Sequence, residues 1–406
     1  MRLSADEQSM VAGELGSVRR EAIEHQIRVG RFFGARDFVA VTQAHVMADT
    51  ESLGEHGVRW LEKLASHVAD ERRVRIPTIT DPRGTDFAHA KRLGQVQWML
   101  DLEQRAIAAF VKLGVLMTDT CINYQTIAPA IRGEHVAFGD TGVVIYTNSV
   151  CGARSNFEGG PSALAAALTG RTPRYGFHLD EYRLPTLRVR TRFEPQSLDE
   201  WGALGGIVGQ IAGNYWSVPI IEGIESIPSS DALKHFGAAM ASFGSVAMFH
   251  LPGITPEASS MRADLPRHEI DASRMREFRT RYAGDDKIDV VVFSAPQLSL
   301  FELEQLATLC DGRRFAVPVL AVTSPQIKPD ADRMGLTSRI EAAGGTVLSG
   351  MCFYQSYARE MAEANGWKRL ATNSAKMTNI LGGYGYRTSL LSMEACIDAA
   401  QKGRIE

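Results

Sequence analysis

The 406-residue chain lacks the features that mark secreted or membrane-spanning proteins. Its five cysteines include no close pair, so they do not form the framework of a small disulfide-rich domain. No run of about 18 apolar residues occurs, which excludes a typical transmembrane helix. The N-terminus also lacks the apolar stretch of a signal peptide. We therefore expect a cytoplasmic protein with no membrane partner.

A large net charge is also absent. The formal net charge is −3, and aromatic residues make up only 8% of the chain. This balance argues against a nucleic-acid partner bound through a broad basic surface. Hydrophobic residues at 45% and charged residues at 22% are typical of a soluble globular protein. The length predicts two or three domains.

Apolar runs and helical periodicity alternate along the chain. Residues 1–35 are predicted to be helical, opening with Ser4 and Glu7 in the spacing of a capping box. Further helices are expected at 57–68, 87–113, 161–168, 205–209 and 236–243. Strands are expected at 37–42, 74–77, 142–146, 246–250, 288–293, 315–322 and 345–348. This β–α order predicts an α/β fold with parallel sheets.

Changes in composition suggest three domains. The first spans 1–200 and holds the main substrate loop, and the second is a small α/β domain with a connection at 201–285. The strongly charged stretch 255–285 is expected to be a surface helix or connection. The third domain spans 286–406. In such folds ligands gather beyond the carboxyl ends of strands, where several polar clusters of this chain fall.

One polar cluster lies between the apolar run 142–146 and the Ala-rich helix at 161–168. Arg154 could hold a substrate carboxylate through two parallel hydrogen bonds. Helix capping and a surface ion pair would explain the same residue types. If the cluster is functional, substrate-binding groups are expected at Asn148, Ser149, Arg154, Ser155 and Asn156.

Cys121 and Cys352 each lie in a predicted loop after a periodic segment. Thiolates that converge from distant loops can bind an iron–sulfur cluster, because soft sulfur ligands suit it. A buried cysteine that serves only as a small apolar residue is the alternative. Cys310 and Cys396 fit that second description better.

Three further residues could carry chemistry. His45 follows a predicted strand and could donate to a substrate or orient a ligand, although a structural histidine is equally consistent. Lys376 could bind a carboxylate or phosphate as a point charge, or could simply be solvated. Ser374 lies on the same turn and could contribute to the same site.

These segments, in this order, resemble the aconitase X family from about residue 3 to about residue 380. The most specific matches are 133–138, 146–156, 159–161, 165–172 and 175–180. Supporting matches are 43–45, 77–78, 120–124, 249–258 and 372–376.

The resemblance implies an aconitase-like three-layer α/β/α architecture and a hydro-lyase with an iron–sulfur cluster. The cluster would act as a Lewis acid toward the leaving hydroxyl. Family activities are dehydration of cis-3-hydroxy-L-proline and of mevalonate 5-phosphate. We expect the former, because no Gly-rich phosphate loop is evident. We assign catalysis to Ser149, Lys376 and His45, and carboxylate binding to Arg154 and Lys376 with Ser374 nearby.

The resemblance also implies a swivelling domain, which this chain is expected to lack. We therefore expect a small swivelling-domain subunit as partner, and a serine on it could serve as the general base. Where family members often carry a Gly-Cys-Pro-His turn, this chain has Ser294–Gln297, with Ala295 in place of the cysteine. Metal ligands are expected at Cys121, Cys352 and a substitute, Cys151. The cluster type (2Fe-2S, 3Fe-4S or 4Fe-4S) stays open.

Two alternatives belong to other classes. The missing cysteine is compatible with a non-catalytic iron sensor that binds RNA, although the mild acidity and the lack of aromatic–basic interleaving oppose it. A scaffolding subunit is disfavoured by the density of polar residues at predicted strand ends.

Overall fold

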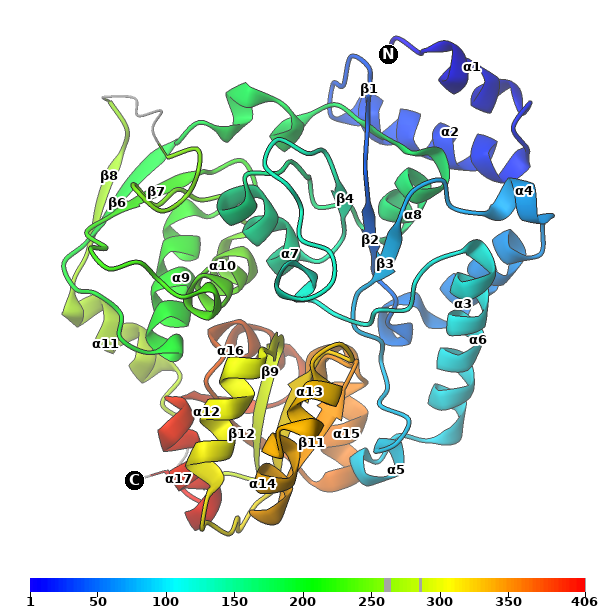
Figure 1. Ribbon diagram of the computed structural model, residues 1–406. Coiled ribbons are helices and arrows are strands. Elements are labelled where there is room, and N and C mark those ends of the chain that lie inside the picture. The colour runs from blue at the N-terminus through cyan, green and yellow to red at the C-terminus, as the bar shows by residue number, and fades with distance from the viewer. Residues whose placement is uncertain (259–263, 285–286, 406) are drawn as a thin grey trace.

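The computed structural model describes residues 1–258, 264–284 and 287–405, and shows three α/β units around a common centre (Figure 1). In the described part, no helix is both long and apolar enough to span a bilayer. The expected charged connection at 255–285 falls partly outside the described residues. Where described, it contains β8 (Arg267–Ile270) and α11 (Ala272–Arg281).

The C-terminal unit is built on a parallel sheet of strand order β11-β10-β9-β12-β13, as far as the described residues show. Its strands are β9 (Val290–Leu298), β10 (Val319–Thr323), β11 (Gly345–Ser349), β12 (Arg369–Thr372) and β13 (Arg387–Leu390). The helices are α12 (Leu300–Cys310), α13 (Lys328–Arg333), α14 (Leu336–Ala342), α15 (Ala358–Asn365), α16 (Ala375–Leu381) and α17 (Met393–Lys402).

Alternation along β9 explains why both faces of this sheet are covered. Val291 and Phe293 join the apolar cluster that contains Leu306 of α12. Val290 and Val292 join the cluster on the other face, with residues of α15 and α16. Helices therefore lie on both sides of a continuous apolar strand, which is the three-layer arrangement expected.

The N-terminal unit has a small parallel sheet of order β3-β2-β4. Its strands are β2 (Ala44–Val46), β3 (Thr78–Thr80) and β4 (Ala137–Phe138), while β1 (Phe38–Ala40) pairs antiparallel with β5 (Arg171–Pro173). The helices are α1 (Ala5–Ala12), α2 (Ser17–Phe32), α3 (Thr50–Ala65), α4 (Ala69–Arg72), α5 (Ala90–Leu93), α6 (Gln97–Leu113), α7 (Thr141–Tyr146) and α8 (Gly160–Thr169).

The middle unit pairs β6 (Leu187–Thr191) with β7 (Pro219–Glu222) and β8, all parallel. Its main helices, α9 (Leu198–Ala212) and α10 (Ser230–Gly244), cross closely because glycines face the partner backbone. A Cβ on Gly205 would lie 2.2 Å from the carbonyl oxygen of Phe236. Because β6 belongs to this sheet, the middle unit begins before residue 201, where we placed its start.

Three predicted strands have another structure. Residues 74–77 form the irregular segment before β3. Residues 142–146 form the buried helix α7, whose N-terminus is capped by Asp140: its Oδ1 accepts from the backbone N–H of Val143 at 2.9 Å. Residues 246–250 are extended but form only an isolated bridge, between His250 and Ile220. A short, fully buried apolar run carries no periodicity that separates strand from helix.

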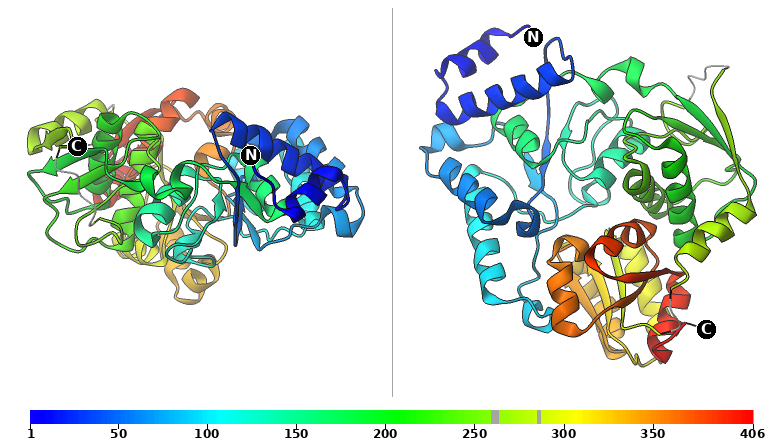
Figure 2. Two further views of the ribbon diagram at one scale, coloured as in Figure 1. Left: turned by 90° about the horizontal axis from the view of Figure 1, so that it is seen from above. Right: turned by 180° about the vertical axis from the view of Figure 1, so that it is seen from behind.

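The three units meet beyond the carboxyl ends of β9 and β11. In Figure 1 the C-terminal unit lies below the other two, with β9 directed toward the region of α7 and the β2–β3 sheet. The view from behind in Figure 2 shows the same arrangement. Segments from all three units therefore line this junction.

Candidate active site

Cys121 and Cys352 reach the junction from different units. The segment that follows α6 runs beside β3, and Cys121 lies at its end. Cys352 lies in the loop that follows β11. Both thiols are buried, and their charges would interact with each other. Burial raises the pKa of Cys121 to about 12 and that of Cys352 well above the usual range. Without a metal, both thiols therefore hold their protons.

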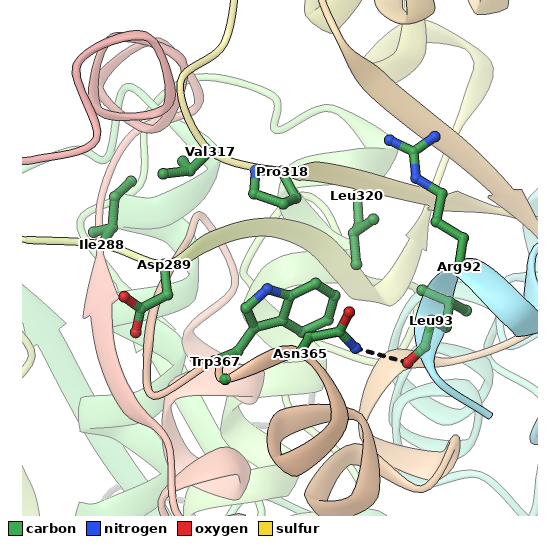
Figure 3. Close-up of a pocket in the computed structure, with 10 residues that line it drawn as sticks. Arg92, Leu93, Ile288, Asp289, Val317, Pro318, Leu320, Asn365 and Trp367 are labelled. Carbon is green, nitrogen blue, oxygen red and sulfur yellow. Dashed lines mark hydrogen bonds between the residues drawn. The ribbon is translucent and has the colours of Figure 1, made fainter. Parts of the chain in front are cut away.

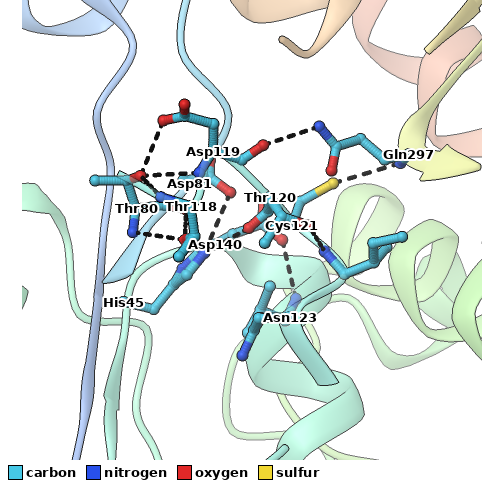
Figure 4. A network of polar contacts seen from close by, with 12 residues as sticks. His45, Thr80, Asp81, Thr118, Asp119, Thr120, Cys121, Asn123, Asp140 and Gln297 are labelled. Carbon is cyan, nitrogen blue, oxygen red and sulfur yellow. Dashed lines mark hydrogen bonds and ion pairs between the residues drawn. The ribbon is translucent and has the colours of Figure 1, made fainter. Parts of the chain in front are cut away.

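Both thiols lie against the irregular segment of β9 between Phe293 and Leu298, where the pairing register with β10 shifts. The backbone N–H of Gln297 donates to Sγ of Cys121 at 3.4 Å, and Oγ of Ser294 lies 4.0 Å from Sγ of Cys352. The side-chain amide of Gln297 donates to the carbonyl oxygens of Asp119 and Met351, each at 3.1 Å. Gln297 thus ties the two cysteine loops together. Figure 4 shows its contacts with Cys121 and Asp119.

A buried cation lies in the same region. Nζ of Lys376, in the first turn of α16, is 3.4 Å from Oδ2 of Asp140. Burial disfavours the charge of Lys376, but the carboxylate of Asp140 outweighs that effect, and the pKa of Lys376 is raised. Burial likewise disfavours the Asp140 carboxylate, yet Lys376 lowers its pKa below the usual value. The two form a charged pair held away from water.

Asp81 and His45 complete this buried group on the side of the N-terminal unit. Nε2 of His45 donates to the carbonyl oxygen of Thr120 at 2.8 Å, which fixes the loop before Cys121. Burial lowers the pKa of His45, so its ring is neutral and carries its proton on Nε2. Asp81 follows β3, and its Oδ1 lies 3.6 Å from that nitrogen. Burial and the nearby Asp140 raise the pKa of Asp81 well above its usual value.

The group can be tested for its fit to an iron–sulfur cluster. Two converging thiols are the soft ligands that iron–sulfur clusters use. Ala295 contributes no third sulfur, and among the described residues no group of three or more His, Cys, Asp or Glu is arranged to hold a metal ion. The site therefore fits a cluster at two positions and leaves the third without protein sulfur.

The residues assigned from sequence divide into two sets. His45, Cys121, Cys352, Ser374 and Lys376 lie at or beside the junction: Oγ of Ser374 donates to the carbonyl oxygen of Ala295 at 2.6 Å and caps α16. The other set, centred on Asn148 and Arg154, lies along the 147–156 segment, which follows α7.

In that second set the polar groups are used internally. The Asn148 amide bonds the backbone of Ser155 and Ala247, and Oγ of Ser149 accepts from the backbone N–H of Phe249 at 2.9 Å. Oγ of Ser155 donates to the carbonyl oxygen of Asn156. The amide of Asn156 serves the 175–177 turn and Tyr215. These contacts give the four side chains a structural role in holding this segment.

Arg154 and Cys151 are likewise apart from the thiol pair. Arg154 donates to Asp180 and to the carbonyl oxygen of His178. Cys151 is partly exposed, and its pKa is raised to about 11 by burial alone, without a contribution from the other thiols. The structure gives no support to Cys151 as the substitute ligand.

Sequence reasoning missed the acidic residues Asp49, Asp81 and Asp140 and the role of Gln297. Asp81 directly follows a strand, and Asp49 and Asp140 cap helices, so each had a local signal. Their convergence had none, because it depends on the packing of segments that are far apart in the chain.

A separate cavity of about 560 Å³ lies at the opposite edge of the C-terminal sheet (Figure 3). It is lined by residues that precede β9, β10 and β12, including Asp289, Pro318 and Trp367. Ligand sites in such sheets lie at the carboxyl ends of strands. The candidate active site is therefore the junction and not this cavity.

Comparison with known proteins agrees with this architecture. Family models described as Aconitase X first, second and third domain match residues 1–181, 185–280 and 288–402. A solved structure, the holo-form of Thermococcus kodakaraensis aconitase X, superposes with a TM-score of 0.90 at 29% identity, covering 98% of this chain and 100% of that one.

Two relatives illustrate the known activities. A phosphomevalonate dehydratase large subunit from Methanothermobacter thermautotrophicus is 36% identical over 94% of each chain. A cis-3-hydroxy-L-proline dehydratase from Pseudomonas aeruginosa is 31% identical over 99% of this chain and 70% of the relative. The chain belongs to the aconitase X family. It is a dehydratase, a carbon–oxygen lyase that eliminates water.

Proposed function

We propose that this chain dehydrates cis-3-hydroxy-L-proline, with an iron–sulfur cluster attached through Cys121 and Cys352. One observation carries the proposal: two buried thiols, the Lys376–Asp140 pair and Asp81 converge where the three units meet. In the elimination, the Cα–H and C3–O bonds break, a carbon–carbon double bond forms, and water leaves.

Lys376 is the group proposed to bind the substrate carboxylate. Its side chain is buried, and Asp140 keeps it charged. In a site closed to water, attraction between an ammonium and a carboxylate is stronger than at the surface. Ser374 holds the start of α16 against Ala295 and so sets the position of Lys376.

A bound cluster would supply Lewis acidity toward the leaving hydroxyl. Around it, Gln297 holds the two cysteine loops, and His45 fixes the Thr120 carbonyl before Cys121. The cluster type stays open, as it did from the sequence. Position 295 offers no sulfur for it.

A small subunit is the proposed partner. Relatives that match nearly the full length of this chain are named large subunits, which implies a separate small one. We propose that the corresponding subunit completes the site here and brings the serine that removes the α proton.

The charges of the site favour an amino acid over a phosphate. Asp49, Asp81 and Asp140 are all buried there, and Lys376 is already paired with one of them. A phosphate dianion would meet this acidic surplus without an arginine cluster to bind it. Mevalonate 5-phosphate is the second candidate, favoured by the names and identities of the archaeal relatives.

The test is an anaerobic assay of the chain co-expressed with its small subunit, supplied separately with cis-3-hydroxy-L-proline and mevalonate 5-phosphate. Turnover of the first with loss of activity in Lys376→Met supports the proposal. Lys63→Met, at an exposed lysine, is the matched control. Turnover of mevalonate 5-phosphate alone would show that it, and not cis-3-hydroxy-L-proline, is the substrate. Turnover of neither compound would refute the proposed function.

A further inference from the structure

Two buried carboxylates of the junction have no cationic partner among the described residues. Asp49 and Asp81 are fully buried, yet neither forms an ion pair with lysine or arginine in the part of the chain that the structure describes. Two neighbouring acids, in contrast, are paired: Asp140 with Lys376, and Asp119 with Arg83. Buried charges are normally paired, because an isolated one is costly to desolvate.

A single amide bridges the two acids. Nε2 of Gln355 lies 3.4 Å from Oδ2 of Asp49 and 3.3 Å from Oδ2 of Asp81. Asp49 uses its other oxygen to cap α3, accepting from the backbone N–H of Ser52 at 2.7 Å. The second oxygen of Asp81, Oδ1, has no hydrogen-bond donor although it is buried. Asp81 therefore has one acceptor position unused.

The unused acceptor lies beside the catalytic groups. The charge of Asp81 interacts with Lys376 and with both thiols, which places it in the same buried region. His45 lies 3.6 Å away but already donates its Nε2 proton to Thr120. A donor that satisfies Oδ1 of Asp81 must therefore come from another residue or from a ligand.

We propose that Asp81, supported by Gln355 and Asp49, binds the ammonium group of a zwitterionic α-amino acid whose carboxylate is held by Lys376. This inference rests on the proposed function and names the residues that select the substrate class. A protonated secondary amine carries a positive charge and two N–H donors, so it supplies both the missing counter-charge and the missing hydrogen bond. A substrate with a phosphate in place of the amine supplies neither.

The test is a binding experiment that does not depend on turnover. L-Proline and cyclopentanecarboxylate share a five-membered ring and a carboxylate, but only proline carries the amine. Isothermal titration calorimetry of each compound is performed on the complex of this chain with its small subunit. We expect the wild type to bind L-proline at least about 10-fold more tightly, since a hydrogen bond to a charged group contributes roughly 1.5–3 kcal/mol.

Asp81→Asn keeps the shape but removes the charge, and it should abolish this preference without weakening cyclopentanecarboxylate. Asp49→Asn, which retains helix-capping ability, should reduce the preference less. Asp199→Asn is the control, because that buried acid is paired with Arg279 in the middle unit. Thermal unfolding of each variant verifies folding.

A preference for L-proline that survives in folded Asp81→Asn would overturn the inference, as would a wild type with no preference. Both results are separable from failure of the proposed function. Dehydration of mevalonate 5-phosphate without affinity for L-proline refutes the ammonium subsite, but the protein remains a dehydratase. Amine-dependent binding lost in Asp81→Asn supports the subsite even where no turnover is measured.

Discussion

The backbone N–H of Gln297 donates to the thiol of Cys121 across 3.4 Å, although the two residues belong to different units. The same residue reaches the loop of Cys352 through the carbonyl oxygen of Met351. Groups that orient metal ligands typically change metal affinity by about 10–100-fold when removed.

Gln297→Ala should therefore weaken iron retention by about that factor, because it frees both cysteine loops. Iron and sulfide content after timed exposure to a chelator measures the effect. Gln326→Ala is the control, since its amide bonds the Thr118 carbonyl of the Cys121 loop, whereas the Gln297 amide bonds the loops of both cysteines. Equal iron retention in both variants would mean that Gln297 does not position the two cysteine loops.

The thiol pair can be distinguished from the other cysteines by its spectrum. Cys121→Ser and Cys352→Ser should each lose most of the visible absorption of the anaerobic complex. Cys151→Ser and Cys310→Ser should keep it, because neither thiol lies in the junction. A loss in Cys151→Ser would restore that residue as the third ligand.

Arg154 offers a test between surface pairing and carboxylate binding. Its ion-pair partner Asp180 is 85% exposed, and such pairs contribute about 0–1 kcal/mol. Arg154→Ala should therefore change KM less than about 2-fold, whereas Lys376→Met should abolish activity. A KM increase beyond about 10-fold, with the melting temperature preserved, would return Arg154 to the substrate site.

A buried ion cluster joins the middle and C-terminal units. Nζ of Lys234 is fully buried and pairs with Glu302, with Asp231 at 3.0 Å, and with the carbonyl oxygen of Gln297 at 3.2 Å. Lys234→Met leaves Glu302 without its main counter-charge and should cost about 3–5 kcal/mol.

Urea unfolding of Lys234→Met measures this loss of stability. Lys63→Met, at a 67% exposed side chain, should stay within about 0.5 kcal/mol of the wild type. A comparable cost in both variants would mean that removal of any lysine, rather than of the buried pair, causes the loss.

Glu158 predicts a pH dependence of stability outside the active site. Burial raises the pKa of Glu158 from 4.5 to about 7, against the hydrogen bond from Oγ1 of Thr172 at 2.6 Å. The folded state therefore binds this proton more tightly, and stability falls as pH rises from about 4.5 to about 7, by about 3 kcal/mol in all.

Glu158→Gln should remove that decline, which is followed by urea unfolding at pH 5, 6, 7 and 8. Glu181→Gln, at an exposed position of the next loop, is the control and should keep the wild-type slope. An unchanged slope in Glu158→Gln would assign the dependence to other groups.

Much of the fold follows from the sequence pattern, and the exceptions have one cause. The run 288–293 is predicted as a strand and largely belongs to β9, and the capping box of Ser299 and Glu302 marks where α12 begins after it. The run 142–146 is equally apolar but forms α7. Its signal was the capping Asp140 just before it, and not the hydrophobicity of the run.

The residues of the candidate site also divide into those that the sequence predicts and those that it does not. Lys376 and the two cysteines were predicted by residue type and by resemblance, and the structure places them at or beside the junction. Asp81 and Gln297 were missed, because their roles come from the meeting of segments that are far apart in the chain. The substrate-binding role predicted for the cluster around Asn148 stays a prediction; in the structure its amides and hydroxyls bond the surrounding backbone.

The two thiols lie on opposite sides of the middle unit in the chain order, and this has a consequence for how the proposed cluster would assemble. During synthesis, Cys121 leaves the ribosome long before β11 and Cys352 exist, so the early unit folds with only one of the two junction thiols. Iron delivered to the nascent chain would find no pair. In the proposed site, a cluster held by both thiols therefore forms only after β11 has been made and the first and third units have met.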